Sequence, residues 1–285
     1  MKLCVVNILP VPEDYLPISR ANVENCCRAV LHADTELHFR APRVGLSLGT
    51  DGLEYHRNPY YEHLLSGAVI DTIVAAEPEG FDAFIINCFD DPGLKQVRSL
   101  VETPVFGLSE PTFAWAASLG AKLGALVPDM PGQVSYVTGQ IERMGLGDRL
   151  IANGVRAEPK RFVDSFAEAL ADTRPMIDRL SEQAREMVDE GADVIVIACG
   201  GLGQVCGNAG FHALHHRGVR IPVVNPLTTA VKTAETAVAM GRALGYDIPS
   251  RVHAGTRLSA TDRRDFRAAF MGEAIETERE RIAAG

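Results

Sequence analysis

Short runs of apolar residues alternate along the chain with longer segments in which apolar positions recur at helical spacing. Apolar runs of this length, bounded by glycine, proline or acidic residues, are typical of buried parallel strands. The predicted strands cover residues 3–8, 35–40, 80–88, 104–108, 122–127, 150–157, 191–199 and 221–225. The predicted helices cover residues 22–31, 67–77, 92–100, 109–119, 133–144, 162–190 and 228–244. This alternation predicts an α/β protein with doubly wound parallel sheets.

Two of the predicted strands are copies of one unit, and each ends in a cysteine. Gly80–Cys88 aligns with Gly191–Cys199, with the glycine, an aspartate and the cysteine at identical offsets. A Pro-Val pair follows each copy, at residues 104–105 and 222–223. Open α/β sheets bind ligands at the carboxyl ends of their strands, where both cysteines fall. If the two halves face each other, they form one cleft with a thiol on each wall, an arrangement suited to moving a proton from one face of a carbon to the other.

Two further segments have a composition of their own. Residues 41–62 are rich in glycine and proline and contain Tyr55, Tyr60 and Tyr61, which is typical of a long loop. The tyrosines either line a pocket or cover apolar surface. Near the carboxyl end, Ser259 and Asp262 have the spacing of a capping box that opens a charged helix. That helix is expected to be solvated, or to pack on the body or on a partner subunit.

Composition narrows the class of protein. The 285 residues include 28 basic and 37 acidic side chains, for a net charge of −9. An acidic chain without a basic patch argues against nucleic-acid and anionic-membrane partners. No apolar run approaches the length of a transmembrane helix, and prolines and acidic residues interrupt residues 3–14 too early for a signal peptide. The six cysteines show neither a CxxC pair nor disulfide density, which predicts reduced thiols and a cytoplasmic location.

Both cysteine motifs resemble those of hydantoin and allantoin racemases, in the aspartate/glutamate racemase superfamily. The resemblance is carried by Asn87–Leu94, by Pro104–Glu110 and by Gly191–Leu202, and it extends over residues 78–127 and 188–240. It implies two pseudo-symmetric α/β lobes with the site in the cleft between them. We expect residues 1–108 plus 226–285 to form the first lobe and residues 109–225 the second. The resemblance also implies a small-molecule substrate, no metal and no cofactor; we further expect a homo-oligomer.

Carried onto this chain, the resemblance assigns proton removal and proton delivery to Cys88 and Cys199. Eight residues beside these motifs or at strand ends are the expected substrate contacts: Asn7, Phe89, Asp90, Ser109, Glu110, Gly200, Gly201 and Asn225. The glycines would let backbone N–H groups approach the enolate oxygen formed when the carbon proton leaves. Three loops depart from the family pattern, at residues 7–10, at Pro128 and at Asn225-Pro226. These departures do not affect the two cysteines, but they touch loops expected to contact the substrate, so they put the identity of the ring substrate in question.

Other interpretations stay open beside this one. A cysteine at a strand end is commonly a small core residue, and we expect Cys4, Cys26, Cys27 and Cys206 to be structural. Ser109 and Glu110 would serve equally as helix caps. The histidines 212, 215 and 216 have helical spacing like that of a metal face, but without a further ligand motif we interpret them as solvated or pocket-rim residues. Residues 201–206 fall one glycine short of a dinucleotide fingerprint. The alternative functions are a decarboxylase or cis-trans isomerase that uses one cysteine, and a non-catalytic binding protein.

Overall fold

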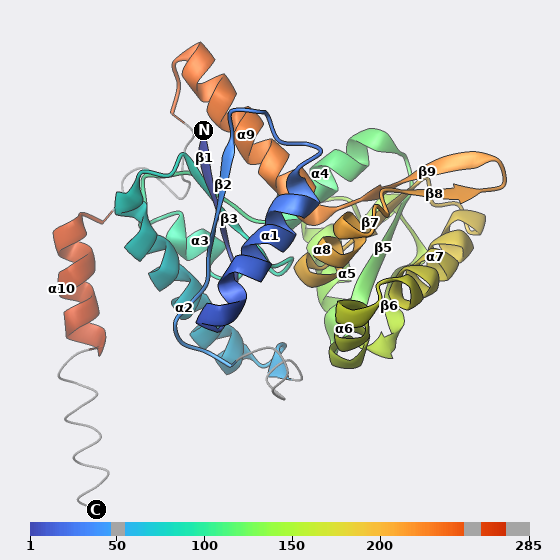
Figure 1. The fold of residues 1–285 in the computed structure, drawn as a ribbon, viewed down its shortest axis with the longest axis horizontal. Coiled ribbons are helices and arrows are strands. Elements are labelled where there is room, and N and C mark those ends of the chain that lie inside the picture. The colour runs from blue at the N-terminus through green and yellow to red at the C-terminus, as the bar shows by residue number, and fades with distance from the viewer. Residues whose placement is uncertain (47–54, 248–257, 272–285) are drawn as a thin grey trace, which may run out of the picture.

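Two β-sheets, one parallel and one parallel except for an edge strand, lie side by side and are covered by helices (Figure 1). The computed structural model describes residues 1–46, 55–247 and 258–271. Gly49 and Gly52 of the predicted loop, and the charged residues beyond Met271, lie outside the described residues. The predicted α/β class with parallel sheets is confirmed. Within the described residues, no helix is both long and apolar enough to span a membrane.

The first sheet has the strand order β2-β1-β3-β4, with every pair parallel. Its strands are β1 (Lys2–Val6), β2 (Glu36–Arg40), β3 (Ala83–Ile86) and β4 (Val105–Phe106). Alternate side chains enter two different cores, because successive residues of a strand face opposite sides of the sheet. Phe84 and Ile86 pack among residues of α2 (Pro59–Ala76), whereas Ala83 and Ile85 pack among residues of α1 (Leu16–Cys27) and α9 (Pro226–Leu244). Burial on both faces explains why this strand is apolar throughout.

The second sheet repeats this order and adds one strand. Its order is β6-β5-β7-β9-β8, in which the first four strands are parallel and β8 is antiparallel to β9. The strands are β5 (Leu123–Asp129), β6 (Leu150–Arg161), β7 (Val194–Ile197), β8 (Ala213–His216) and β9 (Val219–Val224). The arrangement 6-5-7-9 corresponds to 2-1-3-4, so β3 and β7 occupy equivalent inner positions. The two copies recognised in the sequence are therefore structurally equivalent strands.

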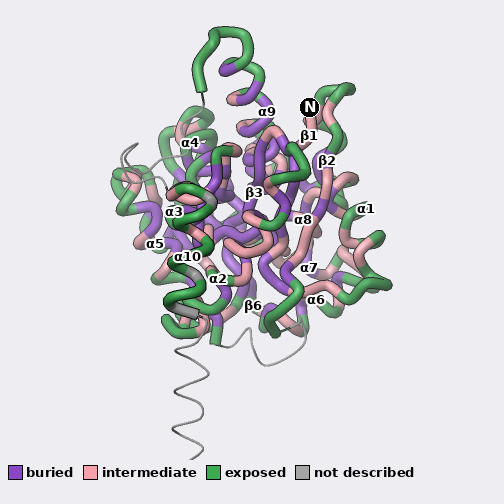
Figure 2. Tube along the Cα trace, turned by 90° about the vertical axis from the view of Figure 1, so that its left-hand side faces the viewer, coloured by how far each residue is buried: buried purple, intermediate pink, exposed green. Residues whose placement is uncertain are grey.

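Helices cover these sheets, and buried positions follow the strands and the helix faces toward them (Figure 2). The remaining helices are α3 (Leu94–Val97), α4 (Ser109–Leu119), α5 (Gln133–Arg143), α6 (Phe162–Ala171), α7 (Arg174–Asp189), α8 (Gly200–Asn208) and α10 (Ala260–Met271). After the second sheet the chain returns to the first through α9, which packs on β1 and β3. The side chain of Glu235 in α9 accepts a hydrogen bond from the backbone N–H of His32 at 2.9 Å. The boundaries of the two lobes at residues 108 and 225 stay a prediction.

Several predicted elements are corrected by tertiary contacts. Histidines 212, 215 and 216 do not lie on a helix: the strands β8 and β9 form a hairpin, turned at Arg217 and Gly218, both of which have positive φ. His216 pairs there with Asp189 at 2.6 Å. The single helix predicted over residues 162–190 is two helices, because the chain breaks at residues 172–173, immediately before the first turn of α7 that contains Pro175.

Other boundaries differ by several residues. Helix α2 begins at Pro59, so the loop predicted over residues 41–62 ends at Asn58, whose side chain caps that helix. Helix α3 is only four residues long, β6 extends to Arg161, and α1 lies about five residues earlier than predicted. The capping box is confirmed: the backbone N–H of Asp262 donates to the Ser259 hydroxyl oxygen at 3.0 Å, and the Ser259 N–H donates to the Asp262 carboxylate at 3.1 Å.

Candidate active site

The turns that follow Cys88 and Cys199 meet where the two sheets approach each other. A Cβ atom placed on Gly200 would lie 2.8 Å from the backbone carbonyl oxygen of Asn87, the residue before Cys88. Only glycine allows the two turns to come this close. The two thiols also interact electrostatically, since the charge of a Cys199 thiolate raises the pKa of Cys88. The structure thus brings together the two cysteines that the sequence placed at equivalent strand ends.

Cys199 is the residue immediately before α8 and has extended backbone, with φ −162°. The backbone amides of Leu202 and Gly201 approach its sulfur closely enough to lower its pKa, although neither makes a full capping hydrogen bond. Burial acts in the opposite direction and dominates, so the pKa of Cys199 is raised to about 12. The Cys199 side of the site therefore offers N–H groups to a sulfur anion.

Cys88 has a different environment, because its thiol faces a carboxylate. Its Sγ donates to Oδ2 of Asp90 across 3.8 Å, and only 8% of the residue is exposed. Burial, followed by the negative charge of Asp90, raises the pKa of Cys88 well above its ordinary value. The backbone N–H of Asp90 partly offsets this effect. The geometry therefore favours the protonated thiol at Cys88.

Asp90 is held ionised by partners from two other segments. His56 Nε2 lies 2.5 Å from its Oδ2, Arg57 forms an ion pair with the same oxygen, and Gln133 donates to Oδ1 at 3.2 Å. Burial would raise the pKa of Asp90, but these partners outweigh it and hold the pKa below its ordinary value. The Arg57 guanidinium also stacks on the Tyr136 ring at 3.9 Å. None of these four residues was predictable from the sequence as a partner of Asp90, because no motif connects residues 56–57 with residues 133–136.

The side chains of His56, Cys88 and Asp90 are also close enough to be considered as metal ligands, with their ligating atoms all within 4.8 Å of one another. The Arg57 guanidinium is paired with the same Asp90 oxygen and supplies the positive charge there. A metal ion would have to displace that cation, so we interpret the cluster as an ion-pair network rather than a metal centre.

Asp91, the next residue, connects the Cys88 turn to α4. It has φ 51° and accepts hydrogen bonds from the backbone N–H groups of Leu108 at 2.6 Å and Ser109 at 3.2 Å, and from the Ser109 hydroxyl. Gly107 makes room for it, since a Cβ there would lie 2.3 Å from the carboxyl carbon. Burial raises the pKa of Asp91 to about 7 despite these hydrogen bonds. Ser109 is thus part of a buried helix cap.

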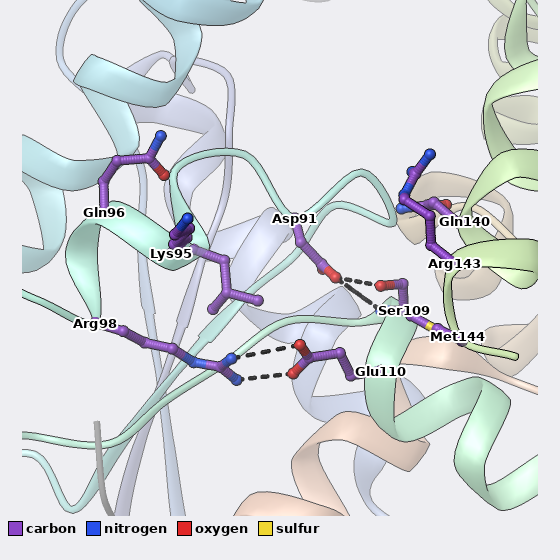
Figure 3. A pocket seen from close by; sticks show the side chains of 10 residues that line it. Asp91, Lys95, Gln96, Arg98, Ser109, Glu110, Gln140, Arg143 and Met144 are labelled. Atoms are coloured by element: carbon purple, nitrogen blue, oxygen red, sulfur yellow. Dashed lines mark hydrogen bonds and ion pairs between the residues drawn. The ribbon is translucent and has the colours of Figure 1, made fainter. Parts of the chain in front are cut away.

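Glu110 lies farther out, where it forms an ion pair with Arg98 at 3.0 Å. Together with Asp91 and Ser109 it borders a cavity of about 480 Å³ (Figure 3). Lys95 and Arg143 also line this cavity, but neither Cys88 nor Cys199 does. The predicted residues Ser109 and Glu110 therefore adjoin a cavity beside the Cys88 turn rather than facing both thiols.

The remaining predicted contacts have distinct surroundings. Asn7 follows β1 beside Asn87, and its side chain donates to the carbonyl oxygen of Leu9 at 2.9 Å. The Phe89 ring is 1% exposed and packs edge-to-face on Phe113, so it belongs to the core. Asn225 caps α9 through its Oδ1, and its amide N–H donates to the Gly203 carbonyl oxygen at 2.5 Å. Gly201 lies against the Phe162 ring.

A second buried carboxylate, on the Cys199 side, was not anticipated from the sequence. Glu158 near the end of β6 is 1% exposed and accepts a hydrogen bond from Arg179 Nε at 2.9 Å and another from the Ser165 hydroxyl. Its other oxygen, Oε2, has no hydrogen-bond partner among the described residues. Its charge is one of the influences that raise the pKa of Cys199. Each cysteine therefore has a buried carboxylate near it that is paired with an arginine.

Comparison with known proteins agrees with this architecture. The sequence matches the family model described as Asp/Glu/Hydantoin racemase over residues 18–234. It is 26% identical over 243 residues to a hydantoin racemase of Pseudomonas sp. (strain NS671), which covers 85% of this chain and 88% of that protein. It is 30% identical over 182 residues to a hydantoin racemase of Paenarthrobacter aurescens, covering 63% of this chain and 72% of the relative.

The fold is similar to that of the allantoin racemase from Klebsiella pneumoniae, with a TM-score of 0.68 at 20% identity over 91% of this chain and 94% of that one. The chain therefore belongs to the Asp/Glu/Hydantoin racemase family, which confirms both the isomerase class and the hydantoin racemase-like membership predicted from its cysteine motifs.

Proposed function

We propose that the protein is a two-cysteine racemase that needs no cofactor and acts on an activated carbon acid, a hydantoin-like ring compound. The observation that carries this proposal is the approach of two equivalent cysteine turns, with Gly200 against Asn87. A thiol on each side of a substrate carbon lets one sulfur remove the proton while the other delivers a proton to the opposite face. The relatives named as hydantoin racemases support the choice of substrate.

The environment of the thiols suits this chemistry. A free thiol has a pKa of about 8.5, and burial raises the pKa of both Cys88 and Cys199 above that range. A thiolate with a high pKa is a strong base, and a ring carbon beside a carbonyl group is more acidic than the α-carbon of a free amino acid. The two effects narrow the gap in proton affinity between sulfur and carbon.

The buried polar groups around the thiols fit a ring that bears N–H and C=O groups. Backbone N–H groups at the start of α8 are placed to stabilise negative charge that develops during proton removal. Donors of this kind contribute roughly 3 kcal/mol each to a transition state. The unpartnered Oε2 of Glu158 is an acceptor for a substrate N–H on the same side. Burial keeps both interactions free of competing water.

Proton NMR in heavy water tests the proposal. A panel of 5-substituted hydantoins, allantoin, free amino acids and maleate would be incubated with the wild type, Cys88→Ala and Cys199→Ala, and optical rotation followed in parallel. We expect deuterium at the ring carbon and loss of rotation with the wild type, and no racemisation with either variant. Cys4→Ala is the matched control, because it removes a buried thiol of β1 whose charged neighbours are Lys2, Arg40 and Glu79 instead of the groups around Cys88 and Cys199.

Three results would contradict the proposal. Racemisation that survives in either single variant would exclude the two-thiol mechanism. Decarboxylation or double-bond isomerisation that needs only one of the cysteines would identify the alternative reactions of the same site. If no compound in the panel exchanges hydrogen or reacts, the hydantoin-like substrate is wrong.

A further inference from the structure

We propose that Asp90, held in place by His56 and Arg57, keeps the proton on Cys88, so that Cys199 is the thiol that ionises first and removes the substrate proton. Asp90 is then a positioning residue for the reaction, and the enzyme starts each cycle from one preferred enantiomer. The preference for one enantiomer during turnover rests on the proposed function. The unequal protonation of the two thiols is a property of the free protein and is testable without any substrate.

The groups that face the two sulfur atoms have opposite polarity. Cys88 Sγ lies 3.8 Å from a carboxylate oxygen, which accepts a hydrogen bond from a thiol and repels a thiolate. Cys199 lies at the start of a nine-residue helix, where the N–H groups of Gly201 and Leu202 approach the sulfur. Backbone N–H groups and the positive end of a helix dipole stabilise a thiolate.

The negative charge of Asp90 is also hard to remove by protonation. Its carboxylate is bound by His56 at 2.5 Å, by Arg57 through an ion pair and by Gln133 at 3.2 Å. Protonating Asp90 would leave the Arg57 guanidinium, which is 14% exposed, with one of its two carboxylate partners lost and only the more exposed Glu62 of the pair, at 3.0 Å, still charged. A fixed negative charge therefore faces Cys88 before substrate binds.

Other titratable groups also interact with the two thiols, but none of them accepts a hydrogen bond from either sulfur as Asp90 does from Cys88. Asp91, Tyr61 and Tyr136 interact with Cys88, while Glu158 and Cys206 interact with Cys199. Asp90 also acts on Cys199, but the thiol that donates to its carboxylate, across 3.8 Å, is that of Cys88. Removing the charge of Asp90 should therefore affect Cys88 more than Cys199.

The proton balance of the cycle follows from this assignment. Cys199, as the thiolate, takes the proton from the substrate carbon, and Cys88 gives its S–H proton to the opposite face. The product leaves a protonated Cys199 and a Cys88 thiolate. The reactive form, with Cys199 as thiolate, is regenerated when Cys199 loses its proton to water and Cys88 regains one. The opposite enantiomer enters the cycle through the less populated form.

Site-resolved alkylation tests this inference. The rate at which iodoacetamide modifies each cysteine would be measured by mass spectrometry at several pH values near 8, in the wild type, Asp90→Asn and Arg57→Gln. Each cysteine is compared with itself between variants, so its accessibility cancels. Asp90→Asn should raise the Cys88 rate at least about tenfold, because the carboxylate that repels the Cys88 thiolate is lost, and should raise the Cys199 rate less. Arg57→Gln should lower the Cys88 rate, because it leaves the carboxylate charge less compensated.

The Cys88 rate is expected to rise in one variant and fall in the other, and this separates an effect of charge from one of loosened packing. Loosened packing alone would raise the Cys88 rate in both variants. Glu186→Gln is the matched control, because it removes a carboxylate from the exposed Arg156 pair and should leave both rates unchanged. An unchanged Cys88 rate in folded Asp90→Asn, or a rise in both variants, would overturn the inference. The alkylation result does not depend on turnover, so failure of every substrate in the NMR panel would remove the proposed function and leave this measurement valid.

Discussion

Replacing Gly200 with alanine is expected to push the two cysteine turns apart. The added Cβ would lie 2.8 Å from the Asn87 carbonyl oxygen and 3.0 Å from its side-chain oxygen, while ordinary contacts of a Cβ begin at 3.4 Å. Asn87 has little freedom to move, because its backbone N–H donates to the Val6 carbonyl oxygen at 2.8 Å at the end of β3. The turns must therefore separate by about 0.6 Å at this contact.

Two effects of different size should follow from this separation. Overpacking of this kind lowers the free energy of unfolding by about 1–3 kcal/mol. A misplacement of roughly 1 Å lowers catalytic rates about 100-fold, so a separation of roughly half that size is expected to reduce kcat by at least about tenfold. Racemisation followed by polarimetry gives kcat, and urea unfolding gives the stability.

Gly67 provides the matched control for this substitution. It lies exposed in α2, and a Cβ added there meets no atom within 4 Å. Gly67→Ala should therefore leave kcat unchanged and stabilise the protein by about 0.5–1 kcal/mol through helix propensity. If Gly200→Ala keeps both wild-type kcat and wild-type stability, the turns are not in the contact that the structure shows, and the argument for opposed thiols fails with it.

Three further predictions concern ionisation and capping. The pKa of Asp91 is raised to about 7 in the folded protein, so the contribution of this group to the free energy of unfolding should be greatest below about pH 4 and fall by up to roughly 4 kcal/mol toward pH 7. Urea unfolding of Asp91→Asn should lack this fall, and an equal dependence of the unfolding free energy on pH in variant and wild type would contradict the prediction. Asn225→Ala removes the cap of α9 and a hydrogen bond to Gly203, and should cost about 2 kcal/mol in thermal unfolding, whereas a change below about 0.5 kcal/mol would be inconsistent with those contacts. Because burial raises the pKa of both Cys88 and Cys199, the proposed mechanism predicts that kcat/KM rises with pH through the range 7–9 instead of levelling off near neutrality, which polarimetric assays across that range can check.

The main features of the fold were predictable from the sequence. The apolar runs of β3 and β7 identify buried parallel strands, since residues covered on both faces must be apolar. The repeated Gly, Asp and Cys offsets identify the two strands as copies, and strand polarity places both cysteines at carboxyl ends. These are local properties, so periodicity and spacing were sufficient to find them.

The surroundings of each thiol were decided by tertiary structure. His56, Arg57 and Gln133 converge on Asp90 from segments that lie 34, 33 and 43 residues away in the chain, and nothing in their local sequence marks them. Phe89, expected at the substrate, packs in the core because the turn after Cys88 directs its ring toward Phe113.

The difference between local pattern and tertiary packing also explains two predictions that the structure changed, one for the secondary structure of residues 212–216 and one for the role of Asn225. The helical spacing of histidines 212, 215 and 216 was overridden by pairing with β9, which supplies hydrogen bonds that the segment alone lacks. Asn225 was expected to contact substrate, yet its amide is engaged by α9 and by Gly203. The sequence by itself determined the two equivalent strands β3 and β7 and the cysteine that follows each of them, because these depend on local pattern. Only the tertiary structure decided which charges face each sulfur, because the side chains responsible come together through packing between distant segments.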